Sequence, residues 1–229
     1  MHPEPDTLSR LCRKLLQEYG EVREWIADFP LHALADDPLD ELIATVLSQA
    51  TNDRNSSRAF TRLKASFPDW EDVLAAPEEE VAAAIACGGL GRQKARSIKA
   101  ILARLKAERG SLSLGFLALL QAAEARRYLM SLPGVGPKTA ACVQLFSLGQ
   151  RAFPVDTHIH RVGARLGFVP AKLPAAKAQA LLEGAVPAAD CLPLHLLLIQ
   201  HGRRFCRPSN PRCGACPLRD ECPSAPSPL

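Results

Sequence analysis

Apolar residues recur every three or four positions along most of the chain, the spacing that places them on one face of an α-helix. The segment after Asp37-Pro38 shows the pattern well, because Asp37 is a good N-cap and Pro38 suits the first helical position. Further helices are predicted over residues 55–67, 77–87, 92–108, 117–132, 137–148, 157–166, 175–186 and 192–202. No segment has the alternation typical of strands, so the pattern predicts an all-α fold.

The composition is that of a soluble globular protein, with 229 residues of which 47% are hydrophobic and 23% charged. Residues 1–10 lack the basic and apolar segments of a signal peptide. No apolar run approaches the length of a membrane-spanning helix. We therefore expect a cytoplasmic, nucleoid-associated protein. The net charge of +4 permits nucleic-acid binding without requiring it.

Half of the eight cysteines lie close together near the C-terminus, and in a cytoplasmic protein such clusters are read first as metal ligands. The four are Cys206, Cys213, Cys216 and Cys222, in the pattern C-x6-C-x2-C-x5-C. One short hook with two longer arms favours an iron–sulfur cluster, because zinc sites usually pair two C-x2-C hooks. A zinc ion is the alternative. Five arginines within 203–219 would be held ready for phosphates.

A tight turn is predicted in the segment Leu-Pro-Gly-Val-Gly-Pro-Lys-Thr-Ala at residues 132–140, between two helices. Its glycines allow backbone angles barred to other residues and let another chain approach closely. The amides that follow, at the positive end of a helix, suit a phosphate. We therefore assign Gly134, Val135, Gly136 and Thr139 to a helix-hairpin-helix that binds the DNA backbone without reading sequence. The alternative is a helical connector without a ligand.

Two residues near this hairpin are candidates for chemistry. Lys138 lies in the first helical turn, where the dipole disfavours a cation and should lower its pKa toward that of a neutral nucleophile. The alternative for Lys138 is a phosphate ligand. Asp156, eighteen residues later, precedes a predicted helix and would be an N-cap by default. Its carboxylate could also stabilise positive charge on a sugar as a base leaves, or take a proton from Lys138.

Together these segments resemble the endonuclease III family of helix-hairpin-helix DNA glycosylases. The resemblance rests on residues 132–140, on Val-Asp-Thr-His-Ile at 155–159, on His-Gly-Arg at 201–203 and on the cysteine pattern, and it spans about residues 37–222. It implies two helical lobes with a DNA-binding cleft between them. Residues 33–150 would form a six-helix barrel that contains the hairpin. Residues 1–32 and 151–229 would form the second lobe, with a [4Fe–4S] cluster loop at 206–222.

The family likeness also implies a mechanism. A damaged nucleotide would be flipped out of the duplex, and Lys138 would attack its C1′, expel the base and form a Schiff base that permits β-elimination, with Asp156 opposite. By the same likeness Gln49 would fill the gap in the duplex and Leu90 would wedge the other strand. The surrounding Ser-Gln-Ala-Thr-Asn-Asp departs from the family pattern. Gln49 could instead be a polar helix-end residue, and Leu90 a loop anchor.

The resulting hypothesis is a monomeric DNA glycosylase and abasic-site lyase of base excision repair, acting on oxidised pyrimidines in double-stranded DNA. An adenine glycosylase would share the cluster but usually lacks the lysine, and this chain has Lys138. An alkylation-repair glycosylase is a further alternative. A DNA-binding or redox-sensing module without chemistry would need the hairpin and the cluster but not the pair Lys138 and Asp156.

Overall fold

The structure is a computed structural model and is described for residues 3–20 and 37–226. Every regular element within those ranges is helical, which confirms the all-α prediction. The chain divides into two compact units: unit 1 comprises residues 1–25 and 151–229, and unit 2 comprises residues 26–150. The lobe boundary expected between residues 32 and 33 lies outside the described residues. No helix in the described ranges is long and apolar enough to cross a membrane.

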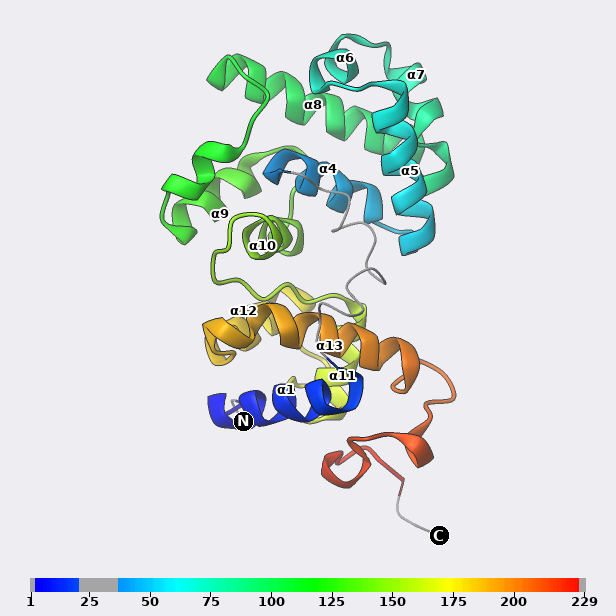
Figure 1. Ribbon diagram of the computed structural model, residues 1–229, viewed down its shortest axis with the longest axis vertical. Helices are drawn as coiled ribbons and strands as arrows, with labels where there is room; N and C mark the ends of the chain where they lie inside the picture. The colour runs from blue at the N-terminus through cyan, green and yellow to red at the C-terminus, as the bar shows by residue number, and fades with distance from the viewer. Residues whose placement is uncertain (1–2, 21–36, 227–229) are drawn as a thin grey trace. The chain divides into compact units, whose positions relative to one another are not determined.

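Unit 2 contains a series of helices and two short 3-10 turns (Figure 1). They are α4 (Pro38–Ser48), α5 (Asp53–Ser66), α6 (Trp70–Ala75), α7 (Glu78–Ala84), η2 (Ala86–Gly88), α8 (Gly91–Arg109), η3 (Gly115–Leu119), α9 (Ala122–Ser131) and α10 (Pro137–Phe146). The described core of this unit is built from apolar side chains of these elements and lies within residues 39–143.

Helix α4 is the central helix of unit 2. Its start is as predicted: the Asp37 carboxylate accepts hydrogen bonds from the amides of Leu39 and Asp40, at 2.7 and 3.0 Å. The sequence pattern predicted one apolar face, but residues 39–47 are all buried because α5, α8 and α10 pack around the helix. Its buried polar groups are paired: the indole of Trp70 donates to Asp40 at 2.8 Å. A helix enclosed on all sides provides a fixed base for the segment that follows it.

The helix expected over residues 117–132 is wrong in its first part. The chain instead forms η3, breaks at Leu120–Gln121 and starts α9 at Ala122. The side-chain amide of Gln150 donates to the carbonyls of Leu117 and Leu120, at 3.3 and 3.2 Å. These bonds take carbonyl groups that a continuous helix would use itself, so a tertiary contact overrides the local pattern.

Unit 1 is formed by α1 (Pro5–Tyr19) from the N-terminal end and by the segment after residue 150. That segment contains α11 (Thr157–Arg165), α12 (Ala175–Ala185), η4 (Ala188–Asp190), α13 (Cys191–Arg204), η5 (Cys213–Ala215) and η6 (Arg219–Glu221). Helix α13 packs against both α1 and α11 (Figure 1). The four clustered cysteines follow α13, in a segment whose only regular structure is the two short turns η5 and η6.

Candidate functional site

The hairpin of unit 2 joins α9 to α10 through residues 132–136. Gly134 has a φ of +75°, a conformation that favours glycine, and a Cβ there would lie 3.3 Å from the Ser97 hydroxyl oxygen. Gly136 is different: its φ is −95°, and nothing lies within 4 Å of the place a Cβ would take. The backbone at Gly136 is therefore open to an approaching molecule.

The side chains of the hairpin refine the sequence assignment. Val135 and Thr139 are only 7% and 4% exposed, so their side chains face the interior of unit 2. Any contact of these two residues with DNA must go through backbone groups. That arrangement suits phosphate binding at the first turn of α10, where the helix dipole is positive. It gives no means of reading base sequence at this point.

Lys138 and Asp156 each occupy the first turn or the cap of a helix. Lys138 is the second residue of α10 and is half-buried. Asp156 is the N-cap of α11, and its Oδ1 accepts a hydrogen bond from the Ile159 amide at 2.8 Å. The capping interpretation of Asp156 is therefore correct. Lys138 belongs to unit 2 and Asp156 to unit 1.

Gln49 and Leu90 are both exposed and both lie in unit 2. Gln49 is the C-cap of α4, and its side-chain amide donates to the Gly134 carbonyl of the hairpin at 3.5 Å. Leu90, just before α8, is 56% exposed. Its φ of 54° is in the left-handed region, which is unfavourable for leucine. The fold thus holds an exposed apolar side chain in a strained conformation.

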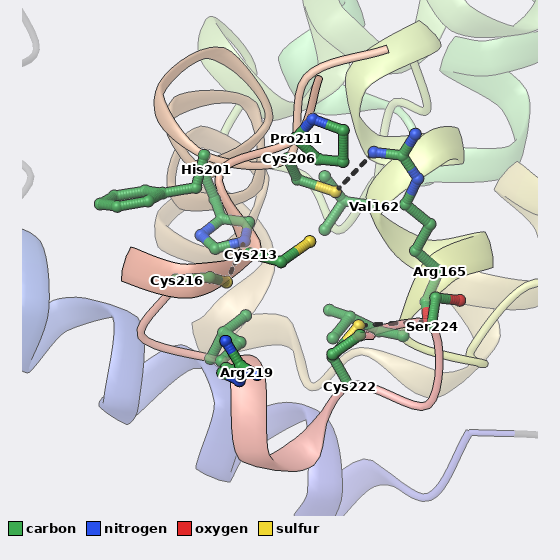
Figure 2. Close-up of a pocket in the computed structure, with 14 residues that line it drawn as sticks. Val162, Arg165, His201, Cys206, Pro211, Cys213, Cys216, Arg219, Cys222 and Ser224 are labelled. Atoms are coloured by element: carbon green, nitrogen blue, oxygen red, sulfur yellow. Dashed lines mark hydrogen bonds between the residues drawn. The ribbon is translucent and has the colours of Figure 1, made fainter. Parts of the chain in front are cut away.

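The four clustered cysteines of unit 1 surround one common space, as Figure 2 shows. They line a cavity of about 230 Å³ together with Val162, Leu166, Phe205 and Leu218. Among the described residues no three Cys, His, Asp or Glu side chains converge closely enough to hold a single metal ion. A zinc site needs four ligands about 2.3 Å from one ion, and the C-x6-C-x2-C-x5-C spacing favours an iron–sulfur cluster over zinc.

Hydrogen bonds to the cysteine sulfurs come from other parts of unit 1. The Arg165 guanidinium donates to Cys206 Sγ at 3.3 Å and to the carbonyls of Arg207 and Pro208, at 2.7 and 3.1 Å. Nε2 of His201 lies 3.7 Å from Cys216 Sγ (Figure 2). Such outer contacts orient metal ligands and stabilise negative charge on sulfur.

Tyr19, a half-buried residue of α1, supports the contact of the buried His201 with Cys216. Burial lowers the pKa of His201 to about 4, so the ring is neutral at ordinary pH. Burial also raises the pKa of Tyr19, whose hydroxyl lies 3.0 Å from Nδ1 of His201. A protonated Tyr19 that donates to Nδ1 places the ring proton on Nε2, which can then donate to Cys216. Helix α1 thus reaches the cysteine site through two hydrogen bonds.

The electrostatics of the thiols also fit a metal group. Burial raises the pKa of Cys216, and the nearby Cys222, Cys206 and Cys213 raise it further. Several thiolates so close together are unfavourable without a compensating positive charge, which bound iron supplies. The residues present therefore fit an iron–sulfur cluster.

Sequence reasoning assigned the four cysteines but missed their supporting residues. His201 stood in a recognised segment, His-Gly-Arg, without a role. The structure shows why Gly202 follows it: a Cβ there would lie 3.0 Å from the His158 side chain, so the segment packs tightly. Nothing in the sequence linked Tyr19 or Arg165 to cysteines that are distant along the chain.

Comparisons with known proteins match two segments of the chain to family models. Residues 43–188 match the family model described as HhH-GPD superfamily base excision DNA repair protein. Residues 206–222 match the model for the iron-sulfur binding domain of endonuclease III. These are the segments that contain the hairpin and the four cysteines. The chain therefore carries a [4Fe–4S] cluster, and the matched segment begins at Cys206 and ends at Cys222.

Curated relatives and solved structures are similar over most of this chain. The protein At3g47830 of Arabidopsis thaliana is 44% identical to this chain over an alignment that covers 72% of this chain. The same alignment covers only 56% of that relative's length. Endonuclease III of Thermotoga maritima is 34% identical over 88% of this chain and 90% of its own length. A structure described as a trapped endonuclease III–DNA covalent intermediate, estranged-adenine complex, is 31% identical. It has a TM-score of 0.73 and covers 92% of this chain and 96% of that one.

Proposed function

Because the chain belongs to the endonuclease III family of the HhH-GPD superfamily of base excision DNA repair proteins, we propose that it is a bifunctional enzyme, both DNA glycosylase and abasic-site lyase. DNA glycosylase activity is the common property of this family. The proposal adds the lyase step, the lysine nucleophile, a preference for oxidised pyrimidines in double-stranded DNA, and action as a monomer.

One observation carries the proposal: Lys138 stands on the first turn of α10, directly after the open backbone of the hairpin. A hairpin that binds a phosphate would bring the deoxyribose of a bound strand near this amine. The positive end of the helix dipole disfavours the ammonium form, and a neutral amine is what a nucleophile needs. A half-buried position further reduces competition from water.

The proposed reaction has two stages, displacement of the base by Lys138 and then β-elimination. Nζ of Lys138 attacks C1′ of an extruded nucleotide, the bond from C1′ to the base breaks, and the base leaves with the bonding electrons and takes up a proton. The Asp156 carboxylate stabilises the developing positive charge and accepts a proton from the attacking amine. Ring opening yields a Schiff base, and loss of a C2′ proton then expels the 3′ phosphate. The covalent complex described for a relative supports this route.

When bound, the cluster would tie together the segment 206–222, which has little regular structure of its own. Arg207 and Arg212 are exposed on that segment and can contact phosphates. The chain's own residues thus supply backbone binding at two places, the hairpin in unit 2 and the arginines in unit 1.

Borohydride trapping on an oligonucleotide duplex tests the nucleophile. The wild-type protein should form a covalent adduct with duplexes that contain thymine glycol, dihydrouracil or an abasic site. It should form little or none with uracil, 8-oxoguanine or 3-methyladenine. The Lys138→Gln variant should give no adduct, because an amide cannot form a Schiff base. Lys177→Gln, at an exposed position of α12, is the matched control and should trap normally.

Equal trapping by Lys138→Gln would show that another amine is the nucleophile. Release of the base without any adduct in the wild type would leave a glycosylase without lyase activity. Adducts on 3-methyladenine alone would move the substrate class from oxidised pyrimidines to alkylated purines.

A further inference from the structure

Lys94 is a buried lysine on the first turn of α8, with 3% of its surface exposed. Its ammonium donates two hydrogen bonds to backbone carbonyls, to Leu47 at 2.7 Å and to Gly88 at 2.9 Å. Leu47 is in the last turn of α4, and Gly88 ends the turn η2. One side chain therefore joins the ends of two elements that are about forty residues apart in the sequence.

Burying an amine is unfavourable, and burial lowers the pKa of Lys94. The two carbonyls offset that cost, because the last carbonyls of a helix have no partner within the helix itself. Lys99 shows the same arrangement at another helix end: its ammonium donates to the carbonyls of Val73, Leu74 and Ala76 at the end of α6. Capping by a lysine thus occurs twice on α8, and only the Lys94 site joins two elements that precede candidate DNA contacts.

Each of the two carbonyls held by Lys94 lies two residues before a candidate DNA contact. Gln49 is two residues after Leu47, and Leu90 is two residues after Gly88. Each of the two segments contains a non-glycine residue in the left-handed region, Ala50 with φ 52° and Leu90 with φ 54°. The two ends also lie near each other, since a Cβ on Gly88 would be 4.0 Å from the Leu47 carbonyl oxygen.

We propose that Lys94 is a positioning residue whose two hydrogen bonds fix the spacing between Gln49 and Leu90, so that these side chains enter a DNA duplex as one rigid unit. The inference rests on the proposed function and on the roles that the family resemblance implies, in which Gln49 fills the gap left by an extruded nucleotide and Leu90 wedges the opposite strand. Lys94 itself is buried and touches no DNA. It acts by holding in advance a spacing that the bound duplex would otherwise have to impose.

This arrangement predicts a coupling that an ordinary structural lysine would lack. Without the ammonium, Gln49 and Leu90 can each still reach the duplex, but the distance between them is no longer set. The contribution of either side chain to lesion binding should then depend on whether Lys94 is present. Contacts that act independently show additive effects, whereas contacts joined through one group do not.

A double-mutant cycle on the full-length, cluster-containing protein measures this coupling. The variants are Lys94→Met, Gln49→Ala, Leu90→Ala and their pairs, and the probe is a duplex with a tetrahydrofuran abasic analogue opposite 2-aminopurine. Affinity and 2-aminopurine fluorescence are both recorded, since the fluorescence reports unstacking by an inserted side chain. Lys99→Met is the matched control, because it removes a lysine cap from the same helix at a distance from both segments.

Lys94→Met should weaken binding roughly tenfold and reduce the fluorescence change. The loss of duplex affinity caused by Gln49→Ala or by Leu90→Ala should be about three- to tenfold smaller in the Lys94→Met background than in the wild type. Lys99→Met should lower Tm but leave affinity, fluorescence and additivity unchanged. If Lys94→Met does not fold, the same cycle on Lys94→Arg applies. The guanidinium of arginine is larger and planar, so it cannot donate to both carbonyls from the one position that the Lys94 ammonium occupies. The same loss of coupling is therefore expected.

Additive cycles, or equal effects of Lys94→Met and Lys99→Met on binding, would overturn the inference. The inference would also be overturned if Gln49→Ala and Leu90→Ala each kept the wild-type affinity and the wild-type fluorescence change. There would then be nothing for Lys94 to position. None of these results would affect borohydride trapping by the wild-type protein, so they leave the proposed function standing. A wild-type protein that neither traps nor binds the abasic duplex would instead refute the proposed function.

Discussion

Asp156 shows at the scale of one residue how a structural and a chemical role can share a side chain. Its Oδ1 caps α11 by accepting the Ile159 amide, while the negative charge itself is not needed for capping. Asparagine caps helices about as well as aspartate, but it carries no charge and accepts no proton. The two roles can therefore be separated by the choice of substitution.

We predict that Asp156→Asn keeps the wild-type Tm but loses base release by roughly a hundredfold or more. Asp156→Ala should lose the same activity and also about 1 kcal/mol of stability, because the cap is removed. Single-turnover base release and thermal unfolding measure the two effects. An Asp156→Asn variant with full activity would reduce Asp156 to a helix cap, and a large loss of Tm in that variant would mean that the charge stabilises the fold.

Residues that act on distant segments were the ones that sequence reasoning failed to find. Lys138, Asp156 and the four cysteines stand in short segments whose spacing carries the signal. Lys94 was placed in a helix but received no role, since its partners Leu47 and Gly88 become neighbours only when α4 and η2 pack together. A buried amine between two helix ends has no local sequence pattern.

At the scale of an element, the hairpin contains two glycines whose backbone conformations and surroundings differ. Gly134 has a positive φ and a close neighbour in Ser97, whereas Gly136 has an ordinary φ and open space around it. We predict that Gly134→Ala costs about 1–2 kcal/mol of stability, from left-handed backbone strain and crowding. Gly136→Ala should leave stability unchanged but weaken DNA binding several-fold, because its methyl group would stand where a phosphate approaches.

Denaturant unfolding and salt-dependent binding to an undamaged duplex check this pair, and each variant serves as the control for the other. If Gly136→Ala binds DNA as tightly as the wild type, the phosphate does not approach the backbone there. If Gly134→Ala is fully stable, the turn can rearrange, and the positive φ is not a requirement of the fold.

The sequence predicts an element correctly where local residues determine its start or end. It fails where packing against distant residues determines them. The start of α4 follows from Asp37 and Pro38, and the hairpin follows from its glycines. The break at Leu120–Gln121 could not be foreseen, because it depends on Gln150, a side chain about thirty residues away. The burial of α4 on all sides was also missed, since amphipathic spacing reports one apolar face and not what surrounds the helix.

At the scale of the whole molecule, the two units have different sources of stability. Unit 2 has an extended apolar core within residues 39–143. In unit 1 the segment after α13 has only short 3-10 turns, and Leu218 is its one fully buried apolar side chain among the described residues. Such a segment buries too little apolar surface to offset its conformational entropy. We expect its order to depend on the cluster and on hydrogen bonds such as those of Arg165.

We therefore predict that Cys216→Ser, which removes one cluster ligand, destabilises unit 1 selectively. The protein should lose its visible iron–sulfur absorbance, and amide hydrogen exchange should rise across 205–222 and in the adjoining last turns of α11 and α13. Exchange in α4, α8 and α10 should stay as in the wild type, because their core contains no cluster contact. Cys87→Ser, a half-buried cysteine of unit 2 outside the cluster, is the control and should keep both absorbance and protection. A rise in exchange throughout both units would show that the chain unfolds as one cooperative body, and no change at all would mean that the segment is ordered without its cluster.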